Sequence, residues 1–216
     1  MNDRLVKGRP RGFDEDQAID SAMRVFWEKS YEGATMADLT EATGLNRSSI
    51  HAAFGSKEGL FLKVVERYWE GPMNLVPKAL AQSALPRAVD ALIRGMVNFL
   101  SIPGNPKGCL SIHGALVCGT NGERVMQIMA ERRKTTESMI KKRIQQAQRE
   151  GELRGEVNAA DYARYIAAIM TGLVVQSLNG ANRAELTRLA DMALQFLERS
   201  SFDPGCAREK KFAQAK

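Results

Sequence analysis

Apolar residues recur every three or four positions along almost the whole 216-residue chain, and alternation of apolar and polar residues hardly occurs. A spacing of three to four places apolar side chains on one face of an α-helix, whereas half-buried strands need a spacing of two. Clusters of β-branched residues, which favour strands, are also scarce. The sequence therefore predicts an all-α fold. Glycine, proline and capping residues set the expected helices at 14–30, 36–43, 46–54, Ser56 to Gly71-Pro72, 86–101, 107–118, 123–150, 159–179 and 183–199.

The stretch LTEATGLNRSSIHAAF, residues 39–54, contains two short helical segments joined through Gly44. On the second segment Ile50 and Phe54 are four residues apart and share one face. The opposite face carries small or polar side chains: Arg47, Ser48, His51 and Ala52. Two short helices with this connection form a helix-turn-helix, whose second helix fits the major groove of DNA. An αα-hairpin with a solvated face is the alternative that the spacing alone leaves open.

The residues around this motif identify it further. AIDSAMRVFWEKSYEGATM, residues 18–36, is followed directly by ADLTEATGLNRSSIHAAFGSKEGLF, residues 37–61. From Phe13 to Leu62 the chain resembles the DNA-binding domain of the TetR family of transcriptional regulators. The resemblance implies a homodimeric all-α protein, in most members a repressor released by a small-molecule inducer. It implies a helix-turn-helix DNA-binding domain of three helices over 1–60, and a larger helical ligand-binding and dimerisation domain over 61–216.

The resemblance also assigns roles to individual residues. The base-reading positions of the family match Arg47, Ser48 and Ala52; arginine suits a guanine edge, and alanine suits a thymine methyl group. Positions that hold the DNA backbone match Thr35, Ser49 and Lys57. His51 stands where the family most often has tyrosine, and it can still donate a hydrogen bond to phosphate. We expect the partner to be a palindromic double-stranded operator.

An arginine-containing arm precedes the first expected helix. In KGRPRG, residues 7–12, Arg9 and Arg11 flank a proline, which favours an extended backbone. Such an arm suits a narrow minor groove of DNA, and a solvated terminus is the alternative. The net charge is +6, but residues 13–60 sum to −5 and residues 1–12 to +3. The case for DNA therefore depends on where the charges lie.

Two long apolar segments, 159–179 and 183–198, are candidates for a dimer interface, because the last two helices of the family pair with their copies. Packing within one subunit is the alternative. The run 131–149, which precedes both segments, holds seven basic and two acidic residues. A charged run on a helix is usually a solvated face, and we interpret it so.

A ligand pocket is expected within the larger domain, with Met96, Phe99, Cys109 and His113 as candidate lining residues. Trp69, Met73 and Met126 are further apolar candidates. Cys109 and His113 share a helical face, but Cys118 falls on the opposite side, so no metal site is predicted. The alternative function on the same scaffold is a thiol-based, redox-responsive regulator, which would need an accessible cysteine of low pKa.

Several function classes find no support in the sequence. It has no glycine-rich phosphate loop and no nucleophile motif, so we expect neither an enzyme nor a cofactor. No apolar run approaches the roughly 18 residues of a membrane span. The N-terminus is charged and lacks the apolar core of a signal peptide. We therefore expect a cytoplasmic protein without membrane contact.

Overall fold

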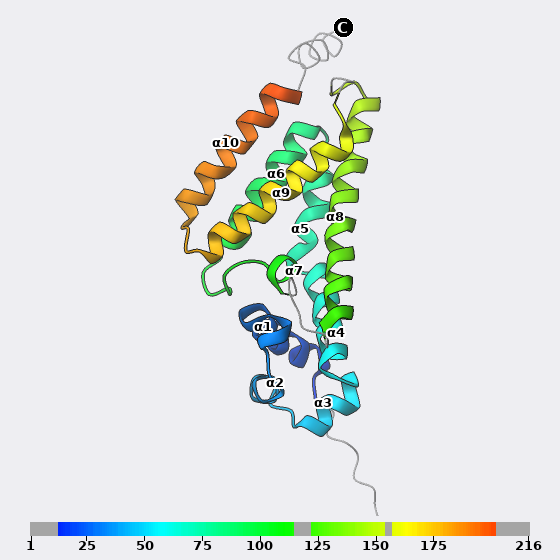
Figure 1. Ribbon diagram of the computed structural model, residues 1–216, viewed down its shortest axis with the longest axis vertical. Helices are drawn as coiled ribbons and strands as arrows, with labels where there is room; N and C mark the ends of the chain where they lie inside the picture. Colours follow the sequence, from blue (N-terminus) through cyan, green and yellow to red (C-terminus); the bar gives the residue numbers. More distant parts are fainter. Residues whose placement is uncertain (1–12, 115–121, 154–156, 202–216) are drawn as a thin grey trace, which may run out of the picture.

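The computed structural model describes residues 13–114, 122–153 and 157–201. Within these ranges all the secondary-structure elements are helices (Figure 1). The all-α prediction is confirmed. The elements are α1 (Glu15–Gly33), α2 (Met36–Thr43), α3 (Arg47–Phe54), α4 (Lys57–Glu70), η1 (Pro72–Asn74), α5 (Leu75–Leu80), α6 (Leu85–Leu100), α7 (Leu110–His113), α8 (Glu123–Arg149), α9 (Ala159–Leu178) and α10 (Arg183–Ser201).

The N-terminal helices owe their bounds to local capping. Thr35 and Asp38 form a capping box: the hydroxyl of Thr35 accepts from the amide of Asp38, whose carboxylate accepts from the amide of Thr35. Gly44 closes α2 with a φ of 67°, a left-handed conformation that costs glycine little. The side chain of Asn46 then caps α3. These caps fix the short turn between α2 and α3.

Helix α4 joins the two parts of the molecule. Its lower part packs against α1, where Phe61 meets the ring of Phe26 at a centroid distance of 5.0 Å and that of Tyr31 at 5.1 Å. Further along, Tyr68 meets Trp27 at 5.1 Å. Such edge-to-face aromatic pairs pack tightly and add stabilisation beyond buried area. The expected domain boundary after residue 60 falls inside this continuous helix and stays a prediction.

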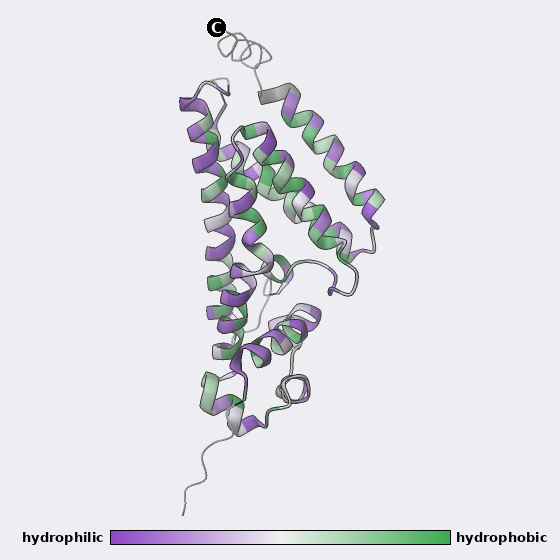
Figure 2. Cartoon of the chain, turned by 180° about the vertical axis from the view of Figure 1, so that it is seen from behind, coloured by the Kyte–Doolittle hydropathy of each residue, from purple (hydrophilic) through white to green (hydrophobic). Residues whose placement is uncertain are grey.

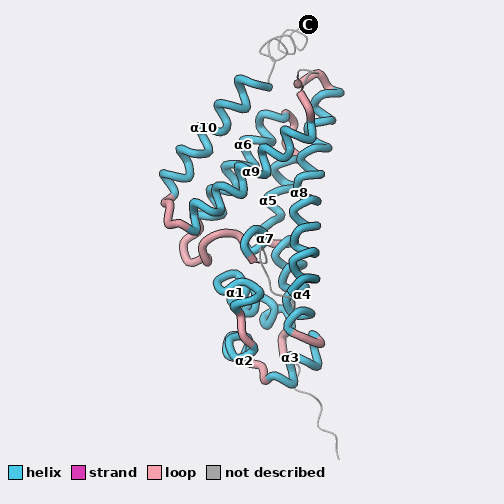
Figure 3. The backbone as a smooth tube through the Cα atoms, viewed as in Figure 1, coloured by secondary structure: helices cyan, strands magenta, loops and turns pink. Residues whose placement is uncertain are grey.

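The C-terminal domain is a helical bundle above the N-terminal helices in Figure 1. Helix α8 forms a long column beside α9, and α10 lies at the edge, packed on α6 and α9. The tube in Figure 3 shows that short loops join most helices; the loop of residues 101–109 before α7 is the longest that the structure describes throughout. Hydrophilic residues occupy much of α8 (Figure 2), as a largely solvated helix requires.

Two sequence predictions about helices are wrong. The helix expected from residue 107 begins only at Leu110, because Gly108 has a φ of 78° and Cys109 is extended. Its expected end, 115–118, lies outside the described residues. The sequence also predicts no helix between Pro72 and residue 86, whereas η1 and α5 lie there. Pro77 is the third residue of α5, where a missing amide hydrogen breaks no helical bond.

Candidate nucleic-acid interface and internal pocket

Helix α3 buries one narrow face and exposes the rest. Ile50 is 0% exposed and Phe54 is 8% exposed, so these two side chains anchor the helix. The exposed residues are Arg47, Ser48, His51, Ala52 and Ala53. The helix contains no carboxylate, so it presents a positive surface although residues 13–60 are acidic in sum. A narrow, lightly charged helix of this kind can enter the major groove.

Hydrogen bonds fix the first turn of α3. The side-chain oxygen of Asn46 accepts from the amide of Ser49 at 2.8 Å and from the hydroxyl of Ser48 at 2.7 Å. The cap therefore orients Ser48 at the exposed N-terminal end of the helix, and the predicted backbone residue Ser49 is half-buried beside it. Recognition helices contact bases with their N-terminal residues, so this end is the relevant one.

A shallow hollow in the surface brings several predicted DNA contacts together. Its lining includes Arg47, Ser48, His51 and Lys57, from the recognition helix and the start of α4. The ammonium of Lys57 also lies over the ring of Tyr31, 4.6 Å from its centroid. Thr35 is exposed at the start of α2. Arg9 and Arg11 of the predicted arm lie outside the described residues.

Asp38 connects α1 to the start of α2, next to this surface. Its carboxylate accepts a hydrogen bond from Lys29 Nζ at 2.6 Å in addition to its contacts with Thr35. The bond from Lys29, followed by those from Thr35, lowers the pKa of Asp38 from 3.8 to about 2. The ionised carboxylate thus ties α1 to the cap of α2.

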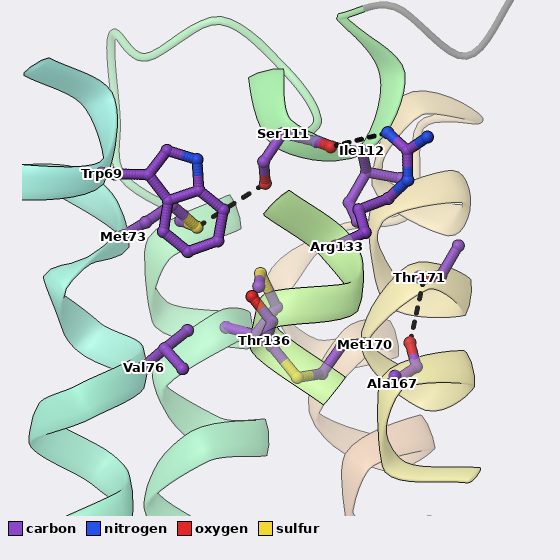
Figure 4. A pocket seen from close by; sticks show the side chains of 11 residues that line it. Trp69, Met73, Val76, Ser111, Ile112, Arg133, Thr136, Ala167, Met170 and Thr171 are labelled. Atoms are coloured by element: carbon purple, nitrogen blue, oxygen red, sulfur yellow. Dashed lines mark hydrogen bonds between the residues drawn. The ribbon is translucent and has the colours of Figure 1, made fainter. Parts of the chain in front are cut away.

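The larger domain contains a small internal pocket (Figure 4). Its volume is about 60 Å³. The described lining residues are mostly apolar, and they come from α4, η1, α5, α6, α7, α8 and α9: Trp69, Met73, Val76, Met96, Ser111, Ile112, Arg133, Thr136, Ala167, Met170 and Thr171. Small-molecule sites share this character, with few polar groups in an apolar wall.

The structure places the predicted pocket residues in different surroundings. Met96 lines the pocket, but Phe99, Cys109 and His113 are not among its lining residues. Phe99 stacks on Trp27 with a centroid distance of 5.4 Å. Cys109 is 0% exposed; its sulfur lies 3.2 Å from the hydroxyl of Tyr68 and 2.9 Å from that of Ser111. Burial raises the pKa of its thiol. Cys118 lies outside the described residues.

His113 joins the larger domain to α1. Its Nδ1 accepts from the amide of Cys109 at 3.2 Å, which leaves Nε2 as the donor to the main-chain oxygen of Trp27 at 2.9 Å. The amide of Tyr31 donates to the oxygen of Gly114 at 2.8 Å. In a regular helix Tyr31 would donate to Trp27. The end of α7 thus satisfies both groups of an interrupted turn of α1, beside Ser30 with its φ of 62°.

Sequence reasoning missed Arg133 and misjudged part of the basic run. Arg133 lines the pocket, and Arg143 is buried, where its guanidinium donates to the oxygen of Gln82 and lies 3.9 Å from Glu152. The interpretation of 131–149 as a solvated face is therefore wrong at these residues.

An all-helical chain with an exposed, capped recognition helix on one end is a helix-turn-helix DNA-binding protein. Family models agree: residues 18–64 match bacterial regulatory proteins of the tetR family, and residues 84–192 match the tetracyclin repressor-like C-terminal domain. The chain belongs to the TetR family and is a DNA-binding transcriptional regulator, not an enzyme. No helix within the described ranges is long and apolar enough to cross a membrane.

Individual relatives support this assignment. The transcriptional repressor ComR of Escherichia coli (strain K12) is 28% identical over 194 residues, which cover 88% of this chain and 91% of ComR. The repressor BdcR of the same organism is 44% identical over 63 residues, 29% of this chain and 32% of BdcR. A cysteine mutant of the TetR family regulator CifR, solved with 26-bp double-strand operator DNA, has a TM-score of 0.84 and 32% identity, covering 87% of this chain and 98% of CifR.

Proposed function

We propose that this chain is a homodimeric repressor of the cytoplasm that binds a palindromic operator and leaves it when a small molecule enters the internal pocket. The observation that carries the proposal is the position of α7. Ser111 and Ile112 of this helix line the pocket, and the next residue, His113, holds α1 of the DNA-binding domain. One short helix therefore contacts both the pocket and helix α1 of the DNA-binding domain.

The exposed face of α3 supports the proposed DNA contacts. We assign base contacts to Arg47, Ser48 and Ala52. Phosphate contacts are assigned to Thr35, Ser49, His51 and Lys57, with Arg9 and Arg11 in the minor groove. Hydrogen bonds to base edges specify the sequence, whereas phosphate contacts set position and orientation. Domains 1–60 and 61–216 divide the two functions, with α4 as the continuous connection.

The outer faces of α9 and α10 support the homodimer. Met192 is 69% exposed and Phe196 is 56% exposed, and the ring of Phe196 lies 5.5 Å from that of Tyr165 on α9. Three further large apolar residues are exposed on these helices: Val175, Leu178 and Leu189. Contiguous exposed apolar surface of this kind favours association. A two-fold dimer would place two recognition helices on the two half-sites of a palindrome.

Coupling between the sites follows from the shared helix. A ligand that repacks Ser111 or Ile112 shifts α7, and the hydrogen bonds from α7 to Trp27 and Tyr31 transmit that shift to α1. Ligand-bound dimers would then favour an arrangement in which the recognition helices no longer fit both half-sites.

The redox-responsive alternative receives less support from the geometry. A reactive cysteine needs access and a lowered pKa. Cys109 has neither, because it is fully buried and its thiol pKa is raised. We therefore favour a non-covalent effector over oxidation of Cys109; Cys118 and Cys206 lie outside the described residues.

The test uses the intergenic DNA upstream of the gene for this protein. It measures how many protein subunits bind this DNA and whether a pocket ligand releases them. Footprinting and sedimentation of the complex should show protection of two symmetric half-sites by protein dimers. Binding of monomers to a single half-site, or failure of every pocket-binding compound to weaken the complex, would contradict the proposal.

A further inference from the structure

The pocket contains one charged residue among those that the structure describes, and that residue has no counter-ion. Arg133 forms no ion pair with any carboxylate in the described ranges, and its Nη1 donates to the main-chain oxygen of Ser111 at 3.2 Å. The undescribed segment 115–121 that follows α7 contains no acidic residue. Withdrawal from water lowers the pKa of Arg133, and no acidic group of the described ranges offsets that effect. A guanidinium stays protonated under these conditions, so a positive charge borders a mostly apolar pocket.

A second polar group of the pocket lacks a hydrogen-bond partner among the described residues. The indole Nε1 of Trp69 is buried and makes no hydrogen bond in the described part of the chain. In Figure 4 Trp69 and Arg133 lie on opposite sides of the pocket, and the indole nitrogen is on the ring edge nearer Ser111. Arg132 lies over the same indole ring, 6.0 Å from its centroid. An unsatisfied buried donor is destabilising, so a hydrogen-bond acceptor on a ligand would be stabilising here.

The remaining wall determines the rest of the ligand. Met73, Val76, Met96 and Met170 offer an apolar lining, and methionine side chains adapt to different shapes. One water molecule needs roughly 10–15 Å³ of cavity volume measured in this way. A pocket of about 60 Å³ therefore holds a ligand of only a few non-hydrogen atoms before the methionines move.

We infer that the effector is a small monocarboxylate whose carboxylate lies between Arg133 and Trp69 and whose short apolar tail packs on the methionines. A planar carboxylate accepts two hydrogen bonds from a guanidinium and still has lone pairs for an indole N–H. Phosphate shares the negative charge but has no apolar part, so the methionine lining would contribute nothing to its binding. The inference deepens the proposed function and rests on its effector pocket.

The test measures binding to the full-length protein without DNA, by calorimetry and by the change in its tryptophan fluorescence, to which Trp27 and Trp69 contribute. The probes are butanoate, hexanoate and octanoate, their matched primary amides, and inorganic phosphate. At least one carboxylate should bind ten-fold or more tightly than its amide, and phosphate should not compete. Equal binding of acid and amide, competition by phosphate, or no binding of any acid would overturn the inference.

Variants separate recognition from packing. Arg133→Gln should lower carboxylate affinity about 10- to 100-fold and leave amide affinity within about two-fold, which is the range for a lost charged hydrogen bond. Arg133→Lys should restore part of the preference. Trp69→Phe keeps an aromatic ring but removes the N–H donor, and it should lower the preference for acid over amide. Lys134→Gln is the matched control, since Lys134 is an exposed cation of the same helix and does not line the pocket. A preference that survives Arg133→Gln would overturn the inference.

Operator binding is then measured separately. A carboxylate that binds through Arg133 but leaves the operator complex intact would uphold this inference and contradict ligand-released repression. Release by the amides alone, without preference for the acids, would uphold the repressor mechanism and overturn the assignment of ligand class.

Discussion

The Nε2 atom of His113 lies 2.9 Å from the main-chain oxygen of Trp27, across the junction between the larger domain and the DNA-binding domain. The hydrogen bond replaces one that a regular turn of α1 would make within itself. His113 is only two residues after Ser111, which lines the pocket. In the proposed mechanism a change in the pocket would reach α1 through a single turn of helix.

Replacing His113 with alanine tests this junction. The change leaves the oxygen of Trp27 and the amide of Cys109 without partners, so the free energy of unfolding should fall by about 1–3 kcal/mol. Effector-induced release should weaken, although binding in the pocket persists. Denaturant unfolding and operator titration measure the two effects. Asn105→Ala, at an exposed residue of the loop before α7, is the control and should change stability by less than about 0.5 kcal/mol. Unchanged coupling in His113→Ala would exclude this route.

The dimer interface can be tested at Phe196. An acidic side chain at a position that is 56% exposed in one subunit costs little in the monomer, but it would be buried in the proposed dimer. Phe196→Glu should therefore shift the protein to monomers in sedimentation equilibrium. Gln195→Glu adds the same charge at the neighbouring exposed residue and serves as the comparison. A stable Phe196→Glu dimer would place the interface elsewhere.

Asp38 predicts a specific dependence of stability on pH. Its pKa is lowered to about 2 in the folded state against 3.8 in a free side chain. The folded state therefore binds this proton more weakly. The resulting stabilisation is present above about pH 4 and is lost as the pH falls towards 2. Urea unfolding should show a smaller loss between pH 4 and 2 for Asp38→Asn than for the unsubstituted protein. Glu66→Gln on α4 is the control; equal slopes for all three proteins would contradict the assignment.

Cys109 should react slowly with thiol reagents in the native protein. It is fully buried and its thiol pKa is raised, so access requires opening of the structure. The experiment uses Cys118→Ser with Cys206→Ser, which leaves one cysteine. Labelling should accelerate strongly in denaturant. Rapid stoichiometric labelling without denaturant would favour the redox-responsive alternative.

Much of the fold was predictable because local signals agree. The caps at Thr35 and Gly44 mark the first helix of the motif in the sequence and in the structure, and the structure adds Asn46 as the cap of α3. The interruption at Gly108 was not predictable, because it depends on distant groups: the oxygen of Gly108 accepts from the indole of Trp27. Helical periodicity contains no information about such a contact.

The two candidate sites also differ in how far local sequence signals predict them. The exposed face of α3 follows from the spacing of Ile50 and Phe54 within one helix, so the sequence was sufficient to predict it. The pocket is assembled from seven elements, and its charged residue lies in a basic run that resembles a solvated face. Only the packing of α8 against α7 and α9 distinguishes Arg133 from its neighbours.

The most direct test of the account is the affinity of Arg47→Ala for labelled upstream operator DNA, measured by fluorescence anisotropy. Arg47 is exposed, so its loss should leave thermal stability unchanged. Affinity for the operator should fall by about 1–3 kcal/mol, the value of one base contact. Lys78→Ala removes an exposed charge far from α3 and should bind as tightly as the unsubstituted protein. Unchanged operator affinity in Arg47→Ala would contradict the assignment of α3 as the recognition helix.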